Sequence, residues 1–166
     1  GTNTTDASGD NKQYNSEFVD NNIENIIPTK NELYLIKGIT YELVGSHKKS
    51  VAKVVGVKSK SLRNVNIPDV INIGGCKYKV VEIGNKAFAN CKNLRKVTIG
   101  KNVKKIGNRA FFKCTKLKKI VIKSKKIKSV KSNSFRKTSR SLIVFVPKKN
   151  YATYKKILKK INVKFK

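Results

Sequence analysis

Few side chains in this sequence could act as catalysts or metal ligands, and their spacing argues against both roles. His47 is the only histidine, in the polar stretch GSHKKS, and no nucleophile or acidic residue stands at a spacing that would make it a general base. We interpret it as a solvated loop residue. Residues 83–166 contain no Asp or Glu, so that half of the chain offers no paired carboxylates for hydrolysis and no oxygen ligands for Ca²⁺ or Mg²⁺. We therefore expect no enzyme activity, no metal site and no cofactor.

The three cysteines are Cys76, Cys91 and Cys114. An odd number without C-x-x-C spacing argues against a zinc site and against a full disulfide framework. Cys91 and Cys114 occupy the same position in two successive repeats, described below. Repeats stacked about 5 Å apart would bring these two residues close to disulfide distance, but we favour free, buried thiols in a small apolar slot.

The formal net charge of +30 arises from 39 Lys and Arg against 9 Asp and Glu in 166 residues. Residues 83–166 hold 28 of the basic residues, whereas residues 1–36 are acidic overall. A positive surface of this size favours an acidic macromolecular partner. Compositional bias towards Lys, Asn and Ile is the competing explanation for the lysines, although it does not account for the missing acids, and both stay open.

No stretch of the sequence approaches the ~18 to 20 consecutive apolar residues that a membrane-spanning helix needs. The N-terminus lacks the basic-then-apolar pattern of a secretion signal. Because the sequence contains no Met, we expect a processed or expressed fragment from which such a signal has been removed.

A 23-residue repeat dominates the second half of the chain. The first copy, from Val80, reads VVEIGNKAFANCKNLRKVTIGKN, and the second, from Val103, reads VKKIGNRAFFKCTKLKKIVIKSKK. Five slots recur at this spacing: Ile83 and Ile106, Phe88 and Phe111, Cys91 and Cys114, Leu94 and Leu117, and Ile99 and Ile122. A third copy from Ile127 and the segment LRNVNIP at 62–68 are degraded terminal copies. Because a unit of this length cannot bury its own core, the copies must stack as rungs of a solenoid.

Within a rung, the segment L-x-x-V-x-I alternates apolar and polar residues and predicts a strand, so stacking builds a parallel sheet. The segment I-G-x-x-A-F-x-x-C-x-x-L has apolar residues three to five apart and predicts a short helical turn, in which Gly84 and Gly107 let the chain bend. Phe88, Phe111 and Phe135 share one slot. An aromatic series could stack nucleic-acid bases, but a shared repeat slot favours the core.

The stretch IGNKAFANCKNLRKVTIGKNVKKIGNRAFFKCTKLKKIVI resembles the BspA-like subgroup of leucine-rich repeats, whose units read I-G-x-x-A-F-x-x-C-x-x-L-x-x-V-x-I. The resemblance is strong over 80–122 and weaker over 123–147. It departs from the family in that the array is short, and that Gly100 and Lys123 replace the proline that usually follows the strand. The resemblance implies a non-enzymatic bacterial protein, secreted or on the cell surface, that binds host or microbial macromolecules.

We expect an α/β solenoid, namely a short leucine-rich-repeat array of parallel sheet and helical turns with a β-rich N-terminal cap and a C-terminal capping helix. Residues 1–30, rich in Asn, Thr, Asp and Ser, predict a disordered or linker arm. Residues 31–166 form one leucine-rich repeat domain. Its parts are the β-rich cap with the degraded first repeat (31–79), the repeats (80–147), and the capping helix with its tail (148–166). The cap is expected to contain strands at 33–36, 39–44, 50–57, 64–67, 70–73 and 77–83.

The capping helix is predicted from KKNYATYKKILKKI, in which apolar and basic side chains would lie on opposite faces of a helix. The apolar face holds Tyr151, Tyr154, Ile157, Leu158 and Ile161. We favour docking of this face on the last rung, and the alternative is contact with an anionic membrane.

Two groups of side chains are candidate contact sites. The first points outward from the strands of the sheet and consists of Asn64, Asn66, Lys96, Thr98, Lys119, Val121, Ile143 and Phe145. We expect Ile143 and Phe145 to be an exposed apolar pair, either a hot spot for binding or a site covered by another segment. The second group, the basic edge, lies at the turns between rungs and consists of Lys104, Lys105, Lys125, Lys126 and Lys128. A solvated surface is the alternative interpretation of the basic edge.

These features predict a binding or adhesion module, extracellular or on the cell surface, that recognises a protein, an anionic glycan or a cell-wall polymer. A nucleic-acid-binding basic protein is an alternative, because the charge alone would give affinity for phosphates, although no recognition helix is visible. A structural spacer domain is a third possibility.

Overall fold

The computed structural model describes residues 2–5, 11–14, 33–45 and 51–166. His47 therefore lies outside the described residues. The elements in chain order are β1 (Thr2–Thr5), β2 (Asn11–Tyr14), β3 (Leu33–Ile36), β4 (Ile39–Val44), β5 (Val51–Val57), β6 (Asn64–Ile67), β7 (Val70–Ile73), β8 (Cys76–Ile83), β9 (Lys96–Ile99), β10 (Lys105–Ile106), β11 (Lys119–Ile122), β12 (Ser129–Val130), β13 (Ile143–Val146), the 3₁₀ helix η2 (Lys148–Asn150), α1 (Tyr151–Ile157) and β14 (Asn162–Phe165).

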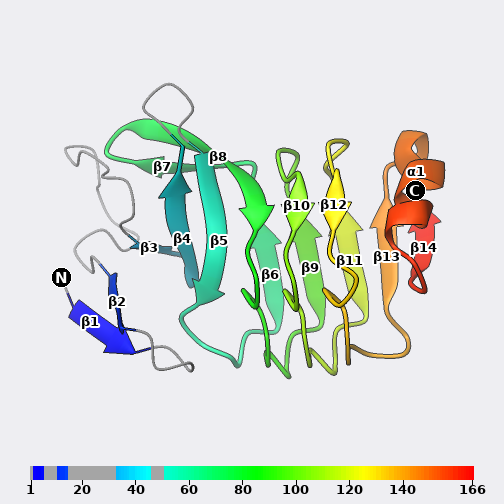
Figure 1. The fold of residues 1–166 in the computed structure, drawn as a ribbon, viewed down its shortest axis with the longest axis horizontal. Coiled ribbons are helices and arrows are strands. Elements are labelled where there is room, and N and C mark those ends of the chain that lie inside the picture. Colours follow the sequence, from blue (N-terminus) through cyan, green and yellow to red (C-terminus); the bar gives the residue numbers. More distant parts are fainter. Residues whose placement is uncertain (1, 6–10, 15–32, 46–50) are drawn as a thin grey trace.

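The β-rich cap lies at one end of the molecule and consists of hairpins joined to the repeats (Figure 1). Strands β3 and β4 pair antiparallel across a turn in which Lys37 and Gly38 both have positive φ, 49° and 80°. Two central residues of positive φ define the type I′ turn, whose twist matches that of a hairpin. Gly74 and Gly75 do the same between β7 and β8, at 59° and 77°. The strands expected in the cap are confirmed.

Two short strands, β1 and β2, lie within the segment 1–30 that was expected to be disordered. They pair antiparallel with each other, and β2 pairs with β3 through Tyr14 and Leu33. The rest of this segment lies outside the described residues, so the division of the chain into an arm and a domain stays a prediction.

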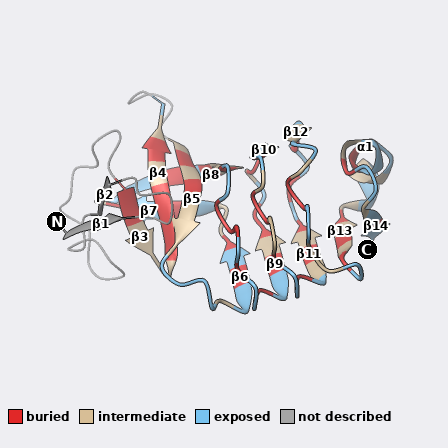
Figure 2. Ribbon diagram, turned by 60° about the horizontal axis from the view of Figure 1, so that its bottom comes forward, coloured by how far each residue is buried: buried red, intermediate tan, exposed pale blue. Residues whose placement is uncertain are grey.

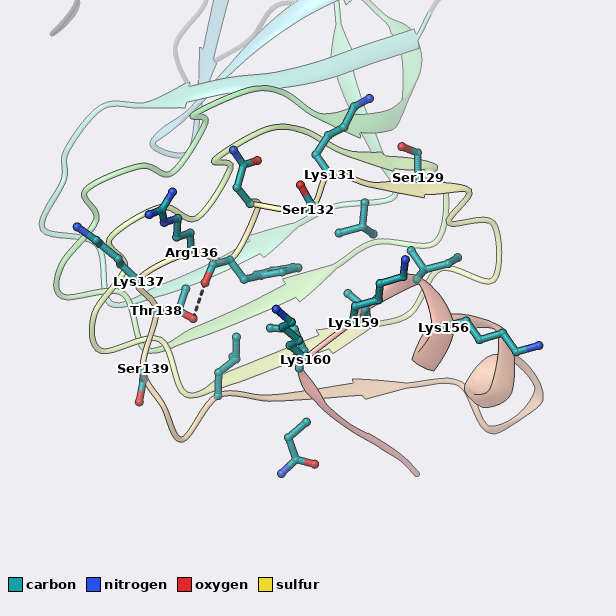
Figure 3. A pocket seen from close by; sticks show the side chains of 18 of the residues that line it. Ser129, Lys131, Ser132, Arg136, Lys137, Thr138, Ser139, Lys156, Lys159 and Lys160 are labelled. Carbon is teal, nitrogen blue, oxygen red and sulfur yellow. Dashed lines mark hydrogen bonds between the residues drawn. The ribbon is translucent and has the colours of Figure 1, made fainter.

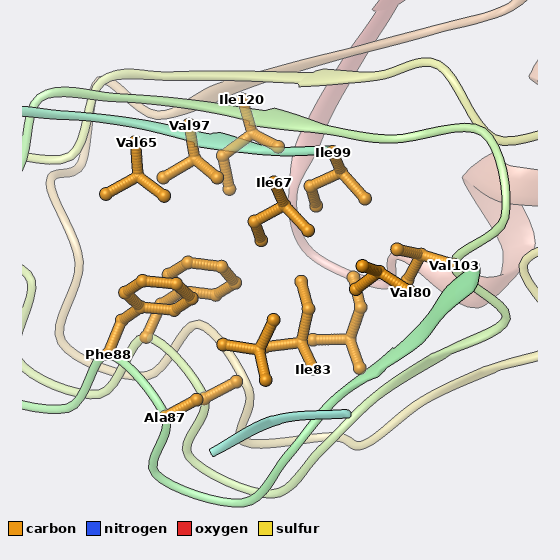
Figure 4. Packing of buried hydrophobic residues seen from close by; sticks show 14 of the residues in the cluster. Val65, Ile67, Val80, Ile83, Ala87, Phe88, Val97, Ile99, Val103 and Ile120 are labelled. Carbon is orange, nitrogen blue, oxygen red and sulfur yellow. The ribbon is translucent and has the colours of Figure 1, made fainter. Parts of the chain in front are cut away.

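The stacked rungs form a parallel sheet in the order β6-β9-β11-β13, as the repeat predicts (Figure 1). Successive strands pair in register, for example Val65 with Val97 and Val97 with Ile120. These side chains point into the core, where Val97 and Ile120 are completely buried (Figure 4). The pairing of β6 with β9 confirms that LRNVNIP is a degraded first copy.

The return half of each rung differs from the helical turn that the spacing predicts. Over residues 80–147 it consists of a strand, namely the end of β8 in the first repeat and the two-residue strands β10 and β12 in the next two, followed by tight turns. Strands β8, β10 and β12 form a second parallel ladder. Beyond the strand, Phe88 N–H donates to Ala110 O at 2.7 Å, and Asn90 N–H donates to Phe112 O at 2.8 Å. A helix does not form because these N–H groups bond to the next rung instead of to a carbonyl four residues back.

Gly84 and Gly107 are required for a reason other than chain bending. Neither has positive φ. A Cβ atom at Gly107 would lie 2.6 Å from Asn85 N, and a Cβ atom at Gly84 would lie 2.8 Å from Val54 O. Gly107 therefore allows close contact between the backbones of adjacent rungs, and Gly84 allows close contact between the first rung and β5 of the cap.

The phenylalanine series is a core ladder, as its repeat slot predicts. The Phe88 and Phe111 rings stack with centroids 5.2 Å apart, and Phe111 and Phe135 stack at 5.5 Å, with the ring planes nearly parallel in both pairs. Phe88 and Phe111 are completely buried, and Figure 4 shows Phe88 within the core. Rings offset and packed in this way contribute both burial and aromatic contact to the stability of the stack.

The C-terminal segment covers part of the last rung. Tyr154 and Leu158 are buried, whereas Lys155, Lys156 and Lys159 are exposed, as an amphipathic capping helix requires. The Tyr154 hydroxyl donates to Ser124 O at 2.7 Å and accepts from Ile127 N–H at 3.0 Å. The helix is shorter than expected, ending at Ile157, and the chain then adds a fifth parallel strand, β14, to β13.

Candidate binding surface

The outward side chains of the five-stranded sheet form two rows, because the strands pair in register. We call this surface the outer face. One row consists of Asn64, Lys96, Lys119, Ile143 and Asn162, and the other of Asn66, Thr98, Val121, Phe145 and Lys164. All eight residues proposed from the sequence are thus brought together. Sequence reasoning missed Asn162 and Lys164, although the alternation INVKF, with Val163 buried, carries the signal of a strand.

Exposure on the outer face falls from β6 towards β13 (Figure 2). Asn64, Asn66 and Lys96 are exposed, whereas Lys119 and Val121 are half-buried. Polar side chains occupy the rows on β6 and β9, apolar ones occupy β13, and the polar Asn162 and Lys164 follow on β14. The surface therefore offers charge and hydrogen bonding on β6 and β9, and apolar contact on β11 and β13.

Ile143 and Phe145 are half-buried, so the expected exposed pair is partly covered. Lys119 Nζ lies 5.2 Å from the centroid of the Phe145 ring, and Lys166 Nζ lies 5.6 Å from it. Both distances are within the range of cation–π interaction. Strand β13, which carries Ile143 and Phe145, pairs with β11 on one side and with β14 on the other. Among the described residues, the large apolar side chains with high exposure are Val70 and Phe165.

The basic edge lies in the connections that follow β9 and β11 and at the first residue of β10, Lys105, and all five of its lysines are exposed. Lys128 N–H donates to Lys104 O at 2.8 Å, so these two residues stack on adjacent rungs. Lys126 Nζ donates to Asn102 Oδ1 at 3.4 Å. The edge is thus ordered by the stacking, although its ammonium groups remain at the surface.

The thiols of the core are held in their neutral form. Cys91 and Cys114 are free and completely buried, and Cys76 is free and exposed. Burial raises the pKa of Cys91, and burial together with the neighbouring Cys91 raises the pKa of Cys114 to about 12. Cys114 Sγ donates to Phe88 O at 3.0 Å. These two thiols fill core space and offer no nucleophile at neutral pH.

The described residues contain no group of three or more side chains that could hold a metal ion. In the same part of the chain, no helix is long and apolar enough to cross a membrane.

The model of the BspA type leucine rich repeat region (6 copies) matches residues 57–165, more than half of the chain. The chain belongs to the BspA-type leucine-rich repeat family. Repeat families of this type are in general interaction modules without catalytic activity. No curated protein matches the chain.

Two solved structures share the fold of this BspA-type chain. A leucine rich cell surface protein from Faecalibacterium prausnitzii A2-165 is 24% identical, with a TM-score of 0.57, and the match covers 72% of this chain and 30% of that one. A leucine-rich repeat protein from Bacteroides ovatus ATCC 8483 is 25% identical, with a TM-score of 0.51, and the match covers 69% of this chain and 37% of that one. The matched regions thus span less than half of each of these two proteins.

Proposed function

We propose that this chain is a non-enzymatic binding or adhesion module of a bacterial surface or secreted protein, and that its outer face contacts an anionic macromolecule. Membership of the BspA-type family supports a binding role. The observation that carries the choice of surface is the register of the sheet, which aligns exposed polar and basic side chains with half-buried Ile143 and Phe145. A central apolar contact surrounded by polar groups is the usual anatomy of a protein interface.

The anionic character of the ligand follows from charge. Residues 83–166 hold 28 basic residues and no acid, and Lys96 and Lys119 carry this charge onto the outer face. A sulfated glycan, a teichoic acid or an acidic protein would be complementary to it. Long-range attraction would speed association, while contacts with the rows would give selectivity.

The test compares two double variants of equal charge. Lys96→Glu/Lys119→Glu reverses two charges on the outer face, and Lys104→Glu/Lys105→Glu reverses two on the basic edge, where both side chains are exposed. Binding of heparin, teichoic acid and polyglutamate would be measured by biolayer interferometry. We expect the outer-face variant to raise Kd for at least one of these ligands about tenfold, or ~1.4 kcal/mol, and the edge variant to raise it less than about threefold.

Salt dependence separates this proposal from general affinity for nucleic acid. Binding through Z phosphates weakens with a log–log slope near ~−0.9Z, and both variants would then lose DNA affinity equally. An outer-face ligand held partly by apolar contact should retain most of its affinity between about 50 and about 300 mM salt. The proposal is wrong if the outer-face variant binds every ligand as well as the wild type, or if the edge variant alone loses binding.

A further inference from the structure

A groove of about 1030 Å³ opens beside the last rung, and Asn162 is the one residue of the outer face that also lines it (Figure 3). Residues 128–142 form one side, and residues 156–162, which span the end of α1, the following turn and the first residue of β14, contribute the other. Neither the family nor the proposed function assigns this groove a role.

The groove lies where the return half of one more rung would stack. In the five-stranded sheet the chain continues from β13 to β14, but the second ladder ends at β12, which pairs only with β10 among the described residues. Phe135 likewise ends the phenylalanine ladder, because one face of its ring stacks on Phe111 and the ring also lines the groove. An unpaired strand edge is a feature that a further strand would cover. Phe135 is 8% exposed, so its ring adds a small apolar surface beside that edge.

Two backbone N–H groups of the third rung lack an acceptor in the described part of the chain, because no further rung stacks on its return half. In the second rung, the N–H groups of Phe111 and Lys113 donate to carbonyl oxygens of the third rung, at 2.8 and 3.1 Å. Phe135 and Lys137 occupy the same places one rung later, and their N–H groups have no acceptor among the described residues. In each earlier rung the acceptors are carbonyls of residues two apart in a single chain segment. The N–H groups of the third rung therefore have the spacing to donate to alternate carbonyls of a peptide that lies where the next rung would stack.

The groove is strongly cationic and contains no acidic residue. Its basic lining residues are Lys128, Lys131, Arg136, Lys137, Arg140, Lys156, Lys159 and Lys160. Arg136 and Lys137 belong to one side, and Lys159 and Lys160 to the other (Figure 3). Half-buried Val130, Ile157 and Ile161 supply apolar surface to the groove, and the buried Phe135 and Leu142 also line it. This combination favours a ligand with negative charges and apolar side chains in alternation, because side chains of an extended chain point to opposite sides in turn.

We propose that the groove binds an extended acidic peptide segment of a partner protein, which takes the place of the missing rung. Alternate carbonyls of the peptide accept from the N–H groups of Phe135 and Lys137, an apolar side chain covers the Phe135 ring, and acidic side chains pair with the basic residues of the two sides. This is recognition by addition of a strand, in which main-chain hydrogen bonds give affinity and side-chain pockets give selectivity. An anionic glycan would satisfy the charge but not the paired carbonyl geometry and the apolar floor together.

The probe is a short fluorescein-labelled peptide in which Glu alternates with Val and Phe, and binding is followed by fluorescence anisotropy. Controls are a peptide of the same composition with its Glu residues clustered, and heparin as a competitor. Arg136→Glu/Lys159→Glu reverses one charge on each side of the groove, and Lys104→Glu/Lys105→Glu is the matched control outside it. All four side chains are exposed, so the variants should fold.

We expect the groove variant to raise Kd of the alternating peptide about tenfold or more, and the matched control and Lys96→Glu/Lys119→Glu to raise it less than about threefold. Bound peptide should slow amide exchange of Phe135 and Lys137 at least about tenfold, measured by NMR. The proposal is wrong if the clustered peptide binds equally well, if heparin displaces the peptide and binds more tightly, or if the peptide binds without protecting these two amides. Since the outer-face variant is a control here, failure of either proposal can be told from failure of the other.

Discussion

At the residue scale, position within the rung decides the chemistry of the cysteines. Cys91 and Cys114 share a slot on adjacent rungs and are completely buried, whereas Cys76 lies exposed at the start of β8. The same residue type therefore has two different environments. For Cys114, burial is the largest cause of a pKa of about 12, compared with an ordinary value of 9.0. Desolvation disfavours the thiolate, which is the reactive form.

We predict that iodoacetamide labels one thiol per folded chain at pH 8 and three in denaturant, as measured by intact mass. Because the folded pKa of Cys114 is raised, the unfolded state releases its thiol proton first, and this group's contribution to stability is lost as pH rises from about 9 towards about 12. Cys76→Ser should abolish native labelling. Labelling of two or three thiols in the folded protein at the rate of Cys76 would contradict the buried slot.

At the element scale, alternation of apolar residues was sufficient to predict β9 and β11, because their inward Val or Ile residues recur at a fixed period. The strands β10 and β12 could not be predicted in this way, since two residues carry no alternation. Positive φ at Lys86 and Arg109 carried no sequence signal either, because neither Lys nor Arg favours it. Lys86 N–H donates to Asn108 O of the next rung, so stacking between rungs accompanies this conformation. The outer face could be predicted from the sequence, because it follows from the alternation within the strands. The groove could not, because it depends on where the second ladder ends.

Close backbone stacking leads to a prediction about two glycines. Gly107→Ala should lower the free energy of unfolding by roughly 1–3 kcal/mol, because its Cβ would lie 2.7 Å from the Gly84 backbone. Gly56→Ala is the matched control, since a Cβ there meets nothing within 4 Å and φ is not positive. It should change stability by less than about 1 kcal/mol. Urea denaturation of both variants is the measurement, and equal effects would show that the rungs are not packed so closely.

At the scale of the whole molecule, one repeat period produces two different surfaces. Continued pairing through β14 extends the outer face beyond the repeats themselves, and the earlier end of the second ladder leaves the cationic groove. Both surfaces depend on rungs that stack in register, because a shift of one residue would turn the outward side chains into the core. The stacking therefore determines where the basic side chains that give the net charge of +30 lie on the surface.

The most direct test of this stacking is the distance between its two ends across the outer face. Spin labels on cysteines replacing Asn64 and Asn162, in a Cys76→Ser background, would be measured by double electron–electron resonance; Cys91 and Cys114 are buried and stay unlabelled. These positions lie in one row, on β6 and β14 at the two edges of the sheet, four strand spacings apart. We predict one narrow distribution centred at about 20–25 Å, from a spacing of ~4.8 Å per strand plus the label arms. A broad distribution, or a mean beyond about 35 Å, would contradict the account.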